Sequence, residues 1–298
     1  MHGCRYALLL LVAGSVLLSA QTSPLTAEQR AQFHGPYGQP EEPFRLIGNI
    51  YYVGAKNIAS YLITTPQGHM LVDTGTTEMT PVITGNVEKL GFRLRDIKIM
   101  LSSHAHFDHV GGHAAMKKLT GARVMAIRQD ADALEAGKDL SPLGDAGWTP
   151  VKVDRVLKDG DTVRLGGTTL RASWAPGHTP GCTVWTTSVP DAGKTYSVAI
   201  FGCGGPNAGV KLVGNQRFPT LVDDTLASFR KLKMLKPDIY VSGHPQMLFA
   251  GKIDRMRAGE RPHPLLDPGS QAWAKMLDDA EANFSKRVQA ARAQSASR

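Results

Sequence analysis

Four residues that can bind a metal ion stand within six positions of the chain, and this cluster restricts the fold more than any other feature. His104, His106, Asp108 and His109 follow directly on an apolar, strand-like run over residues 97–101. His104 and His106 are two apart and share a face of an extended chain, whereas Asp108 and His109 come just before the chain turns at two glycines. Neutral imidazole and carboxylate are zinc ligands. We therefore predict a metal centre at the end of a strand, with ligands that can address two ions.

One segment cannot complete two four-coordinate sites, so further ligands are expected downstream. His178 lies in a loop rich in glycine and proline after a strand-like run, and His244 follows another such run at residues 239–241. Taken alone, each is more typical of a hydrogen-bonded loop histidine. Beside the first cluster, both are predicted to be ligands. The other histidines lack such a setting, and we expect the nearest of them to open a helix and point away: His113, with His2, His34, His69 and His263 also set aside.

Short runs of β-branched and aromatic residues alternate with helical patterns along most of the chain. Strand-like runs come first and helices follow, and this order occurs twice. We therefore predict an α/β (α+β) fold in which two sheets pack face to face with helices outside, formed by residues 44–298 as a single domain. With 298 residues, 42% of them apolar and 20% charged, the chain can bury a large core, which excludes a disordered or disulfide-scaffold protein. The predicted elements include a strand over 97–101 and helices over 113–119, 129–136, 222–235 and 270–290.

The first twenty residues have the layout of a secretory signal peptide. A short basic start precedes an apolar run over residues 7–18, and small residues provide a cleavage point between Ala20 and Gln21. The run is too short to span a membrane as a helix, and a buried N-terminal helix is the other interpretation. We expect residues 1–20 to be removed and residues 21–43 to form an irregular arm. The mature protein is then expected to be periplasmic, without a membrane anchor.

The formal net charge of +8 at pH 7 would permit binding to nucleic acid or to a membrane surface. The basic residues are scattered, however, and the densest group, Lys231, Lys233 and Lys236, has the spacing of a solvated helix face. We therefore expect no nucleic-acid partner, a small-molecule substrate, and a monomer.

Taken together, the motifs resemble the metallo-β-lactamase superfamily. The resemblance rests on the His-Ala-His-Phe-Asp-His cluster, on Gly-His-Thr-Pro-Gly around His178, on the late His244, and on Val-Asp-Thr-Gly around Asp73. It implies a four-layer αββα sandwich with two zinc ions, and Asp73 would brace the site rather than bind metal. By motif, the two zinc ligand sets would be His104, His106 and His178 for one ion, and Asp108, His109 and His244 for the other.

Two details make the resemblance specific to β-lactamases of subclass B3. Relatives that hydrolyse thioesters or lactones place a metal-bridging aspartate after a late strand, where residues 202–207 of this chain contain no carboxylate. Subclass B1 lacks the histidine that follows the motif aspartate, which is His109 here. The resemblance implies hydrolysis of penicillins, cephalosporins and carbapenems by a zinc-bound hydroxide that Asp108 orients, conferring antibiotic resistance. A lactonase or glyoxalase II-like thioesterase of the same fold is the alternative, and a non-catalytic metal-binding module is a third.

The two cysteines of the predicted mature chain leave three states open. Cys203 could bind zinc, remain a free thiol, or pair with Cys182 in an oxidising compartment. The predicted strands 183–188 and 196–201 flank a turn at 190–194, so residues whose numbers sum to about 384 would face each other in an antiparallel hairpin. The numbers 182 and 203 sum to 385, which favours the disulfide.

The chain departs from the subclass B3 pattern where the substrate would be held. Many B3 enzymes use serines and a tyrosine after the hairpin strand, and the matching positions here are Gly204, Pro206 and Val210. The substrate carboxylate must therefore be anchored differently. Asn207, Lys211 or backbone amides are the predicted substrate contacts.

Overall fold

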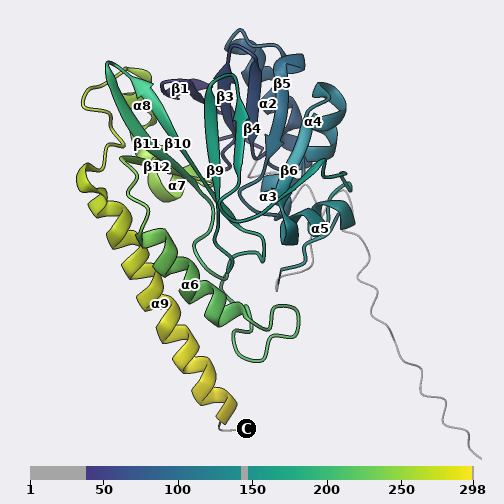
Figure 1. Cartoon of the computed structure of the whole chain (residues 1–298), viewed down its shortest axis with the longest axis vertical. Helices are drawn as coiled ribbons and strands as arrows, with labels where there is room; N and C mark the ends of the chain where they lie inside the picture. The colour runs from purple at the N-terminus through teal and green to yellow at the C-terminus, as the bar shows by residue number, and fades with distance from the viewer. Residues whose placement is uncertain (1–37, 142–146, 297–298) are drawn as a thin grey trace, which may run out of the picture.

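Two β-sheets lie at the centre of the fold (Figure 1). The computed structural model describes residues 38–141 and 147–296, so the predicted signal peptide and most of the predicted arm lie outside the described residues. The seven strands of the first sheet follow sequence order: β1 (Phe44–Ile47), β2 (Ile50–Tyr52), β3 (Tyr61–Thr65), β4 (Gly68–Val72), β5 (Ile97–Leu101), β6 (Arg123–Ile127) and β7 (Arg155–Leu157). The second sheet has the order β12-β11-β10-β9-β8, formed by β8 (Thr162–Leu165), β9 (Thr168–Trp174), β10 (Thr183–Asp191), β11 (Lys194–Phe201) and β12 (Ile239–Ser242).

Helices cover the outer faces of both sheets. Four helices lie on the side of the first sheet: α2 (Thr80–Lys89), α3 (Phe107–Val110), α4 (His113–Thr120) and α5 (Arg128–Ala136). The second sheet is covered by α6 (Leu221–Lys233) and the long α9 (Gln271–Ala296), with α7 (Pro245–Leu248) and α8 (Ile253–Arg257) between them in the chain. Among the described residues, no helix combines the length and the apolar character needed to cross a membrane.

Three separate layers of buried side chains show that the fold has four layers. Between the sheets, residues such as Ile99 of β5 pack in one core with Trp185 of β10. The outer face of the first sheet packs in a second core, which includes Met100. The outer face of the second sheet packs in a third, which includes Phe229 of α6 and Trp273 of α9. The αββα sandwich predicted from the sequence is confirmed.

The middle of the first sheet explains where the metal-binding cluster sits. β5 pairs in parallel with β4 on one side and β6 on the other, and four of its five residues are buried. Parallel strands covered on both faces are typically rich in apolar residues, as residues 97–101 are apart from the exposed Lys98. The residues after Leu101 therefore leave the sheet at the carboxyl edge of its parallel strands, where ligand sites of α/β folds commonly lie.

Most predicted elements agree with the structure to within two residues. The strand over 97–101 has both predicted ends, and the predicted helix 129–136 is α5. The predicted helix 270–290 is too short, because α9 continues to Ala296. Its last turns are rich in alanine, the strongest helix former, so the helix persists where the apolar periodicity fades.

Candidate metal centre

The loop after β5 carries the first four predicted ligands. His104 and His106 lie on the loop, and α3, a single turn, begins directly after His106 and carries Asp108 and His109. All four side chains are buried. Folding the chain into this one turn places Asp108 and His109 beside His104, with ligand atoms of the three within 4.8 Å of one another.

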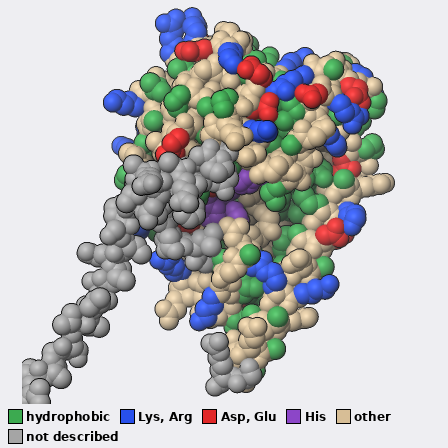
Figure 2. Space-filling model, turned by 180° about the vertical axis from the view of Figure 1, so that it is seen from behind, with side chains coloured by type: hydrophobic (Ala, Val, Ile, Leu, Met, Phe, Trp, Pro, Cys, Tyr) green, Lys and Arg blue, Asp and Glu red, His purple; other side chains and the backbone are tan. Residues whose placement is uncertain are grey.

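The other two predicted ligands come from the second sheet. His178 lies in the loop between β9 and β10, and His244 directly follows β12. Residues that are far apart in the sequence therefore meet where the two sheets end. Figure 2 shows histidine side chains gathered in one place on a face of the molecule.

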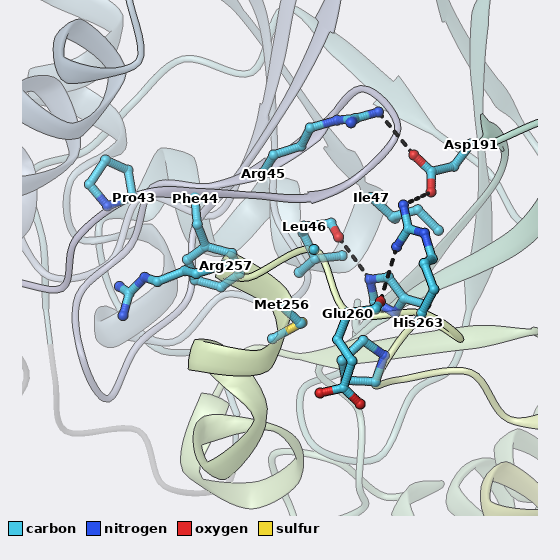
Figure 3. A pocket seen from close by; sticks show the side chains of 13 residues that line it. Pro43, Phe44, Arg45, Leu46, Ile47, Asp191, Met256, Arg257, Glu260 and His263 are labelled. Carbon is cyan, nitrogen blue, oxygen red and sulfur yellow. Dashed lines mark hydrogen bonds and ion pairs between the residues drawn. The ribbon is translucent and has the colours of Figure 1, made fainter.

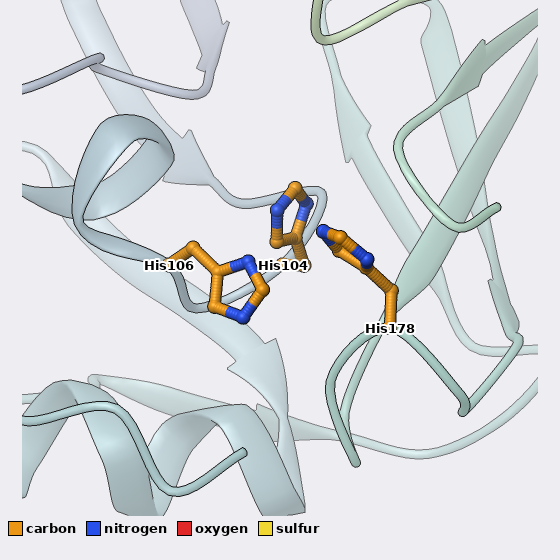
Figure 4. A group of neighbouring side chains, drawn as sticks. All are labelled: His104, His106 and His178. Atoms are coloured by element: carbon orange, nitrogen blue, oxygen red, sulfur yellow. The ribbon is translucent and has the colours of Figure 1, made fainter. Parts of the chain in front are cut away.

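His104, His106 and His178 form the first ligand group. Their ligand atoms lie within 4.8 Å of one another. The ring centroids are 4.8 Å apart for His104 and His106, 4.5 Å for His104 and His178, and 4.6 Å for His106 and His178. The three rings converge from three directions (Figure 4), as the ligands of one ion must.

Asp108, His109 and His244, the predicted second ligand group, also lie close together. Nε2 of His109 and Nε2 of His244 are 3.3 Å apart. Oδ2 of Asp108 lies 3.6 Å from each of these nitrogens. The ring of His104 is 4.0 Å from that of His109, centroid to centroid, so the two groups are neighbours.

Every ligand histidine has one ring nitrogen engaged outside the ligand groups, which leaves the other free to bind metal. Nε2 of His104 is buried and has no hydrogen-bond partner among the described residues, as expected for a nitrogen that faces a metal ion. The bonded nitrogens and their partners are Nδ1 of His104 with Ser103 Oγ (3.1 Å), Nε2 of His106 with Ser141 Oγ (3.2 Å), Nδ1 of His109 with Asp73 Oδ2 (3.0 Å), Nδ1 of His178 with Gly205 O (3.0 Å) and Nδ1 of His244 with Asn57 O (3.3 Å).

Electrostatics favour the protonation states that metal ligands require in the first group and at Asp108. Burial lowers the pKa of His109, but Asp108 and Asp73 outweigh it, and the net shift there is upward. Burial lowers the pKa of His106 to about 4 and that of His178 to about 3, so both imidazoles are neutral at pH 7. Burial raises the pKa of Asp108, but nearby His109 and His244 outweigh it, and the net shift is downward. The first group therefore offers neutral nitrogens, and the second also offers an ionised carboxylate. This donor set fits zinc.

Sequence reasoning missed part of the support around His106. Oδ2 of Asp139 lies 3.5 Å from Nε2 of His106, and Asp139 also accepts a hydrogen bond from the backbone N–H of Ser141 (2.7 Å). A carboxylate behind a ligand histidine fixes its ring orientation. The only signal in the sequence is an aspartate two residues after Gly137, the glycine that caps the C-terminus of α5, and no motif marks it.

Cys203 is bonded to Cys182 in a disulfide, with the two Cα atoms 5.9 Å apart. Of the three states left open by the sequence, the structure contains this one. The register of β10 and β11 pairs Trp185 with Ile200, whose numbers also sum to 385. Cys203 therefore offers no thiolate to a metal ion, and the side chains of the two candidate ligand groups are histidine and aspartate.

The loop after β11 reaches the first ligand group through its backbone. Gly205 O accepts the hydrogen bond from His178, and Asn207 O accepts one from Arg287 of α9 (2.7 Å). Asn207 is half-buried and Lys211 is exposed. The structure thus brings this loop to the site, and the substrate contacts of the two side chains remain predictions.

A cavity at the edge of the first sheet differs in character from the metal centre. It measures about 410 Å³, and none of the six ligand residues lines it. Three of its charged groups pair with each other, because Asp191 accepts hydrogen bonds from Arg45 (2.9 Å) and Arg261 (2.7 Å). His263 bonds to Leu46 O (2.8 Å; Figure 3). These bonds hold β1 against the β10–β11 hairpin, so the cavity is a structural junction.

The fold and the two ligand groups define a class of protein. Residues 53–244 match the metallo-beta-lactamase superfamily, a span that includes Asp73 and all six ligand residues. The chain belongs to this superfamily.

Among solved structures, metallo-beta-lactamases are similar over nearly the whole domain. The subclass B3 metallo-beta-lactamase BJP-1 of Bradyrhizobium japonicum is 39% identical, with a TM-score of 0.80 over 89% of this chain and 99% of that chain. Native FEZ-1 metallo-beta-lactamase from Legionella gormanii is 35% identical, with a TM-score of 0.80 over 86% of this chain and 98% of that chain.

The curated relatives that match by sequence are named as a different kind of hydrolase. A hydroxyacylglutathione hydrolase of Rhodopseudomonas palustris is 37% identical over 119 residues, which are 40% of this chain and 39% of that protein. One of Cereibacter sphaeroides is 29% identical over 202 residues, or 66% of both chains. The match to the first of these relatives thus covers well under half of its length.

Proposed function

We propose that this protein is a zinc-dependent β-lactamase of subclass B3, which hydrolyses the amide bond of penicillins, cephalosporins and carbapenems and so confers antibiotic resistance. The observation that carries the proposal is the ligand set, two groups built only from histidine and aspartate while Cys203 is held in a disulfide. Similarity to B3 enzymes over 99% of BJP-1, against 39% of the Rhodopseudomonas hydrolase, supports the same choice.

Two zinc ions would be held by the two ligand groups, and when bound they would supply an activated water and a Lewis acid for the lactam carbonyl. The protein's part is to fix the ligands and to handle the proton of the water. Asp108 remains an ionised carboxylate, because His109 and His244 outweigh its burial. It can accept a hydrogen bond from the attacking water and so orient it.

The absence of a carboxylate after β11 favours lactams over thioesters. The chain leaves β11 at Phe201 and continues as Gly-Cys-Gly-Gly-Pro-Asn. A metal-bridging aspartate, expected in glyoxalase II-like relatives, has no counterpart in this segment. Substrate binding then depends on the loop with Asn207 and Lys211, which His178 and Arg287 hold by its backbone.

The proposal is tested by turnover of a carbapenem and a nitrocefin-type cephalosporin, with and without a chelator. A glutathione thioester and a homoserine lactone are assayed in parallel. We expect lactam hydrolysis that the chelator abolishes and added zinc restores. His178→Ala should lose it, whereas Lys118→Ala, an exposed position on α4, should not. Chelator-sensitive cleavage of the thioester or the lactone alone would refute the lactamase assignment.

We also propose that the protein is exported to the periplasm as a monomer, with cleavage after Ala20. The basic start and the apolar run of residues 7–18 support export. The N-terminal sequence of the protein recovered from the periplasm should begin at Gln21.

A further inference from the structure

A buried aspartate joins the two loops that carry the first ligand group. Asp130 lies in the first turn of α5 and is 2% exposed. Its Oδ2 accepts hydrogen bonds from the backbone N–H of Ala105 (2.8 Å) and from Oγ1 of Thr179 (3.0 Å). Its Oδ1 accepts one from the backbone N–H of Gly181 (2.9 Å). One carboxylate thus bonds two segments that belong to different sheets.

Two of the three donors are placed immediately beside the ligands, and the third is three residues from His178. Ala105 stands between His104 and His106, and Thr179 directly follows His178. The carboxylate itself bonds to backbone and hydroxyl groups and to none of the three imidazoles. It therefore acts on the ligands through the chain that carries them.

The approach of the second loop to Asp130 requires a glycine. A Cβ built at Gly181 would lie 2.5 Å from Cγ of Asp130 and 2.4 Å from its backbone nitrogen. No side chain fits at that distance. The final glycine of the Gly-His-Thr-Pro-Gly motif thus serves contact with Asp130.

The arrangement is unfavourable for a carboxylate unless a cation is near. Burial raises the pKa of Asp130 to about 7, although its hydrogen bonds to Thr179, Ala105 and Gly181 lower it. No lysine or arginine among the described residues forms an ion pair with it. A divalent ion in the first ligand group would favour the ionised form.

We propose that Asp130 is the positioning residue of the three-histidine site: it holds the loop of His104 and His106 in register with the loop of His178. The inference rests on the proposed metal centre and not on the substrate. Failure of lactam hydrolysis would leave it standing, because its test measures metal binding.

The test measures zinc and cobalt(II) binding to metal-free protein by titration against a competing chelator. A His244→Ala background weakens the second ligand group and isolates the first, and a His178→Ala background does the reverse. Asp130→Asn keeps the shape but turns one acceptor into a donor that faces an N–H or a hydroxyl. We expect it to weaken the first site about 10–100-fold, to alter the cobalt absorption spectrum of that site, and to leave the second site within about threefold.

Asp132→Asn is the matched control, since Asp132 lies on the same helix with its side chain 55% exposed. It should change neither site. Thr179→Val removes one of the three hydrogen bonds, so it should also weaken metal binding at the first site, but by a smaller factor than Asp130→Asn. If Asp130→Asn does not fold, Thr179→Val provides the test. Unchanged affinity and spectrum at the first site would overturn the proposal. Equal weakening of both sites, in step with a loss of thermal stability, would also overturn it by showing a general structural role.

Discussion

Each ligand histidine uses its two ring nitrogens for different purposes, and this division determines what the site can bind. His109 shows this division most clearly, through its contact with Asp73. Asp73 lies just after β4 with φ of 61°, a conformation that non-glycine residues seldom adopt. Its carboxylate accepts hydrogen bonds from the backbone N–H (2.6 Å) and the hydroxyl (2.7 Å) of Ser103. It also lies 3.0 Å from Nδ1 of His109. The proton of His109 is thereby held on Nδ1, and Nε2 faces Asp108 and His244.

Replacing Asp73 by asparagine should impair the second ligand group selectively. The amide N–H₂ would face the N–H of His109 and favour the tautomer whose Nε2 is protonated and cannot bind metal. We expect the second ion to bind about 10–100-fold more weakly and the first to stay within about threefold. Chelator competition measures both. Asp130→Asn is expected to do the opposite, weakening the first site and sparing the second. Equal losses of affinity at both sites in either variant would contradict the view that each aspartate supports one site.

At the scale of elements, the β10–β11 hairpin connects the second sheet to the site. Its register continues beyond the paired strands to Cys182 and Cys203, which are both buried. The disulfide closes the hairpin just before the loop that bonds to His178 through Gly205 O. The position of that loop therefore depends on the hairpin being closed.

Removing the disulfide should lower stability without removing the metal ligands. The bond closes a separation of 21 residues. The Cys182→Ala, Cys203→Ala double variant is expected to lose about 3 kcal/mol of unfolding free energy, because the unfolded chain is no longer constrained. Urea unfolding of the metal-free protein measures the change, and reduced wild type should behave like the variant. An unchanged midpoint in both would show that the bridge does not stabilise the fold.

At the scale of the whole molecule, the residues of the candidate ligand groups could be predicted from the sequence, and much of what holds them in place could not. The cluster from His104 to His109 can be recognised because its four residues lie within six positions after one predicted strand. His178 and His244 can be recognised because each follows a strand-like run. No motif marks Asp130 or Asp139, because their partners depend on how α5 and the chain after it pack against loops that are remote in sequence. The same limit applies to the substrate loop. Its composition predicts Asn207 and Lys211 as substrate contacts, whereas the hydrogen bonds of its backbone carbonyls depend on Arg287 of α9.

The central claim is that six residues bind two metal ions, and metal content per chain tests it most directly. After removal of metal and dialysis against zinc, we predict two zinc ions bound to the wild-type chain and to Lys118→Ala. One ion should remain in His178→Ala and one in His244→Ala, because each variant removes a ligand from a different group. A wild-type chain that binds a single ion, or either histidine variant that keeps two ions at unchanged affinity, would contradict the two-ion centre.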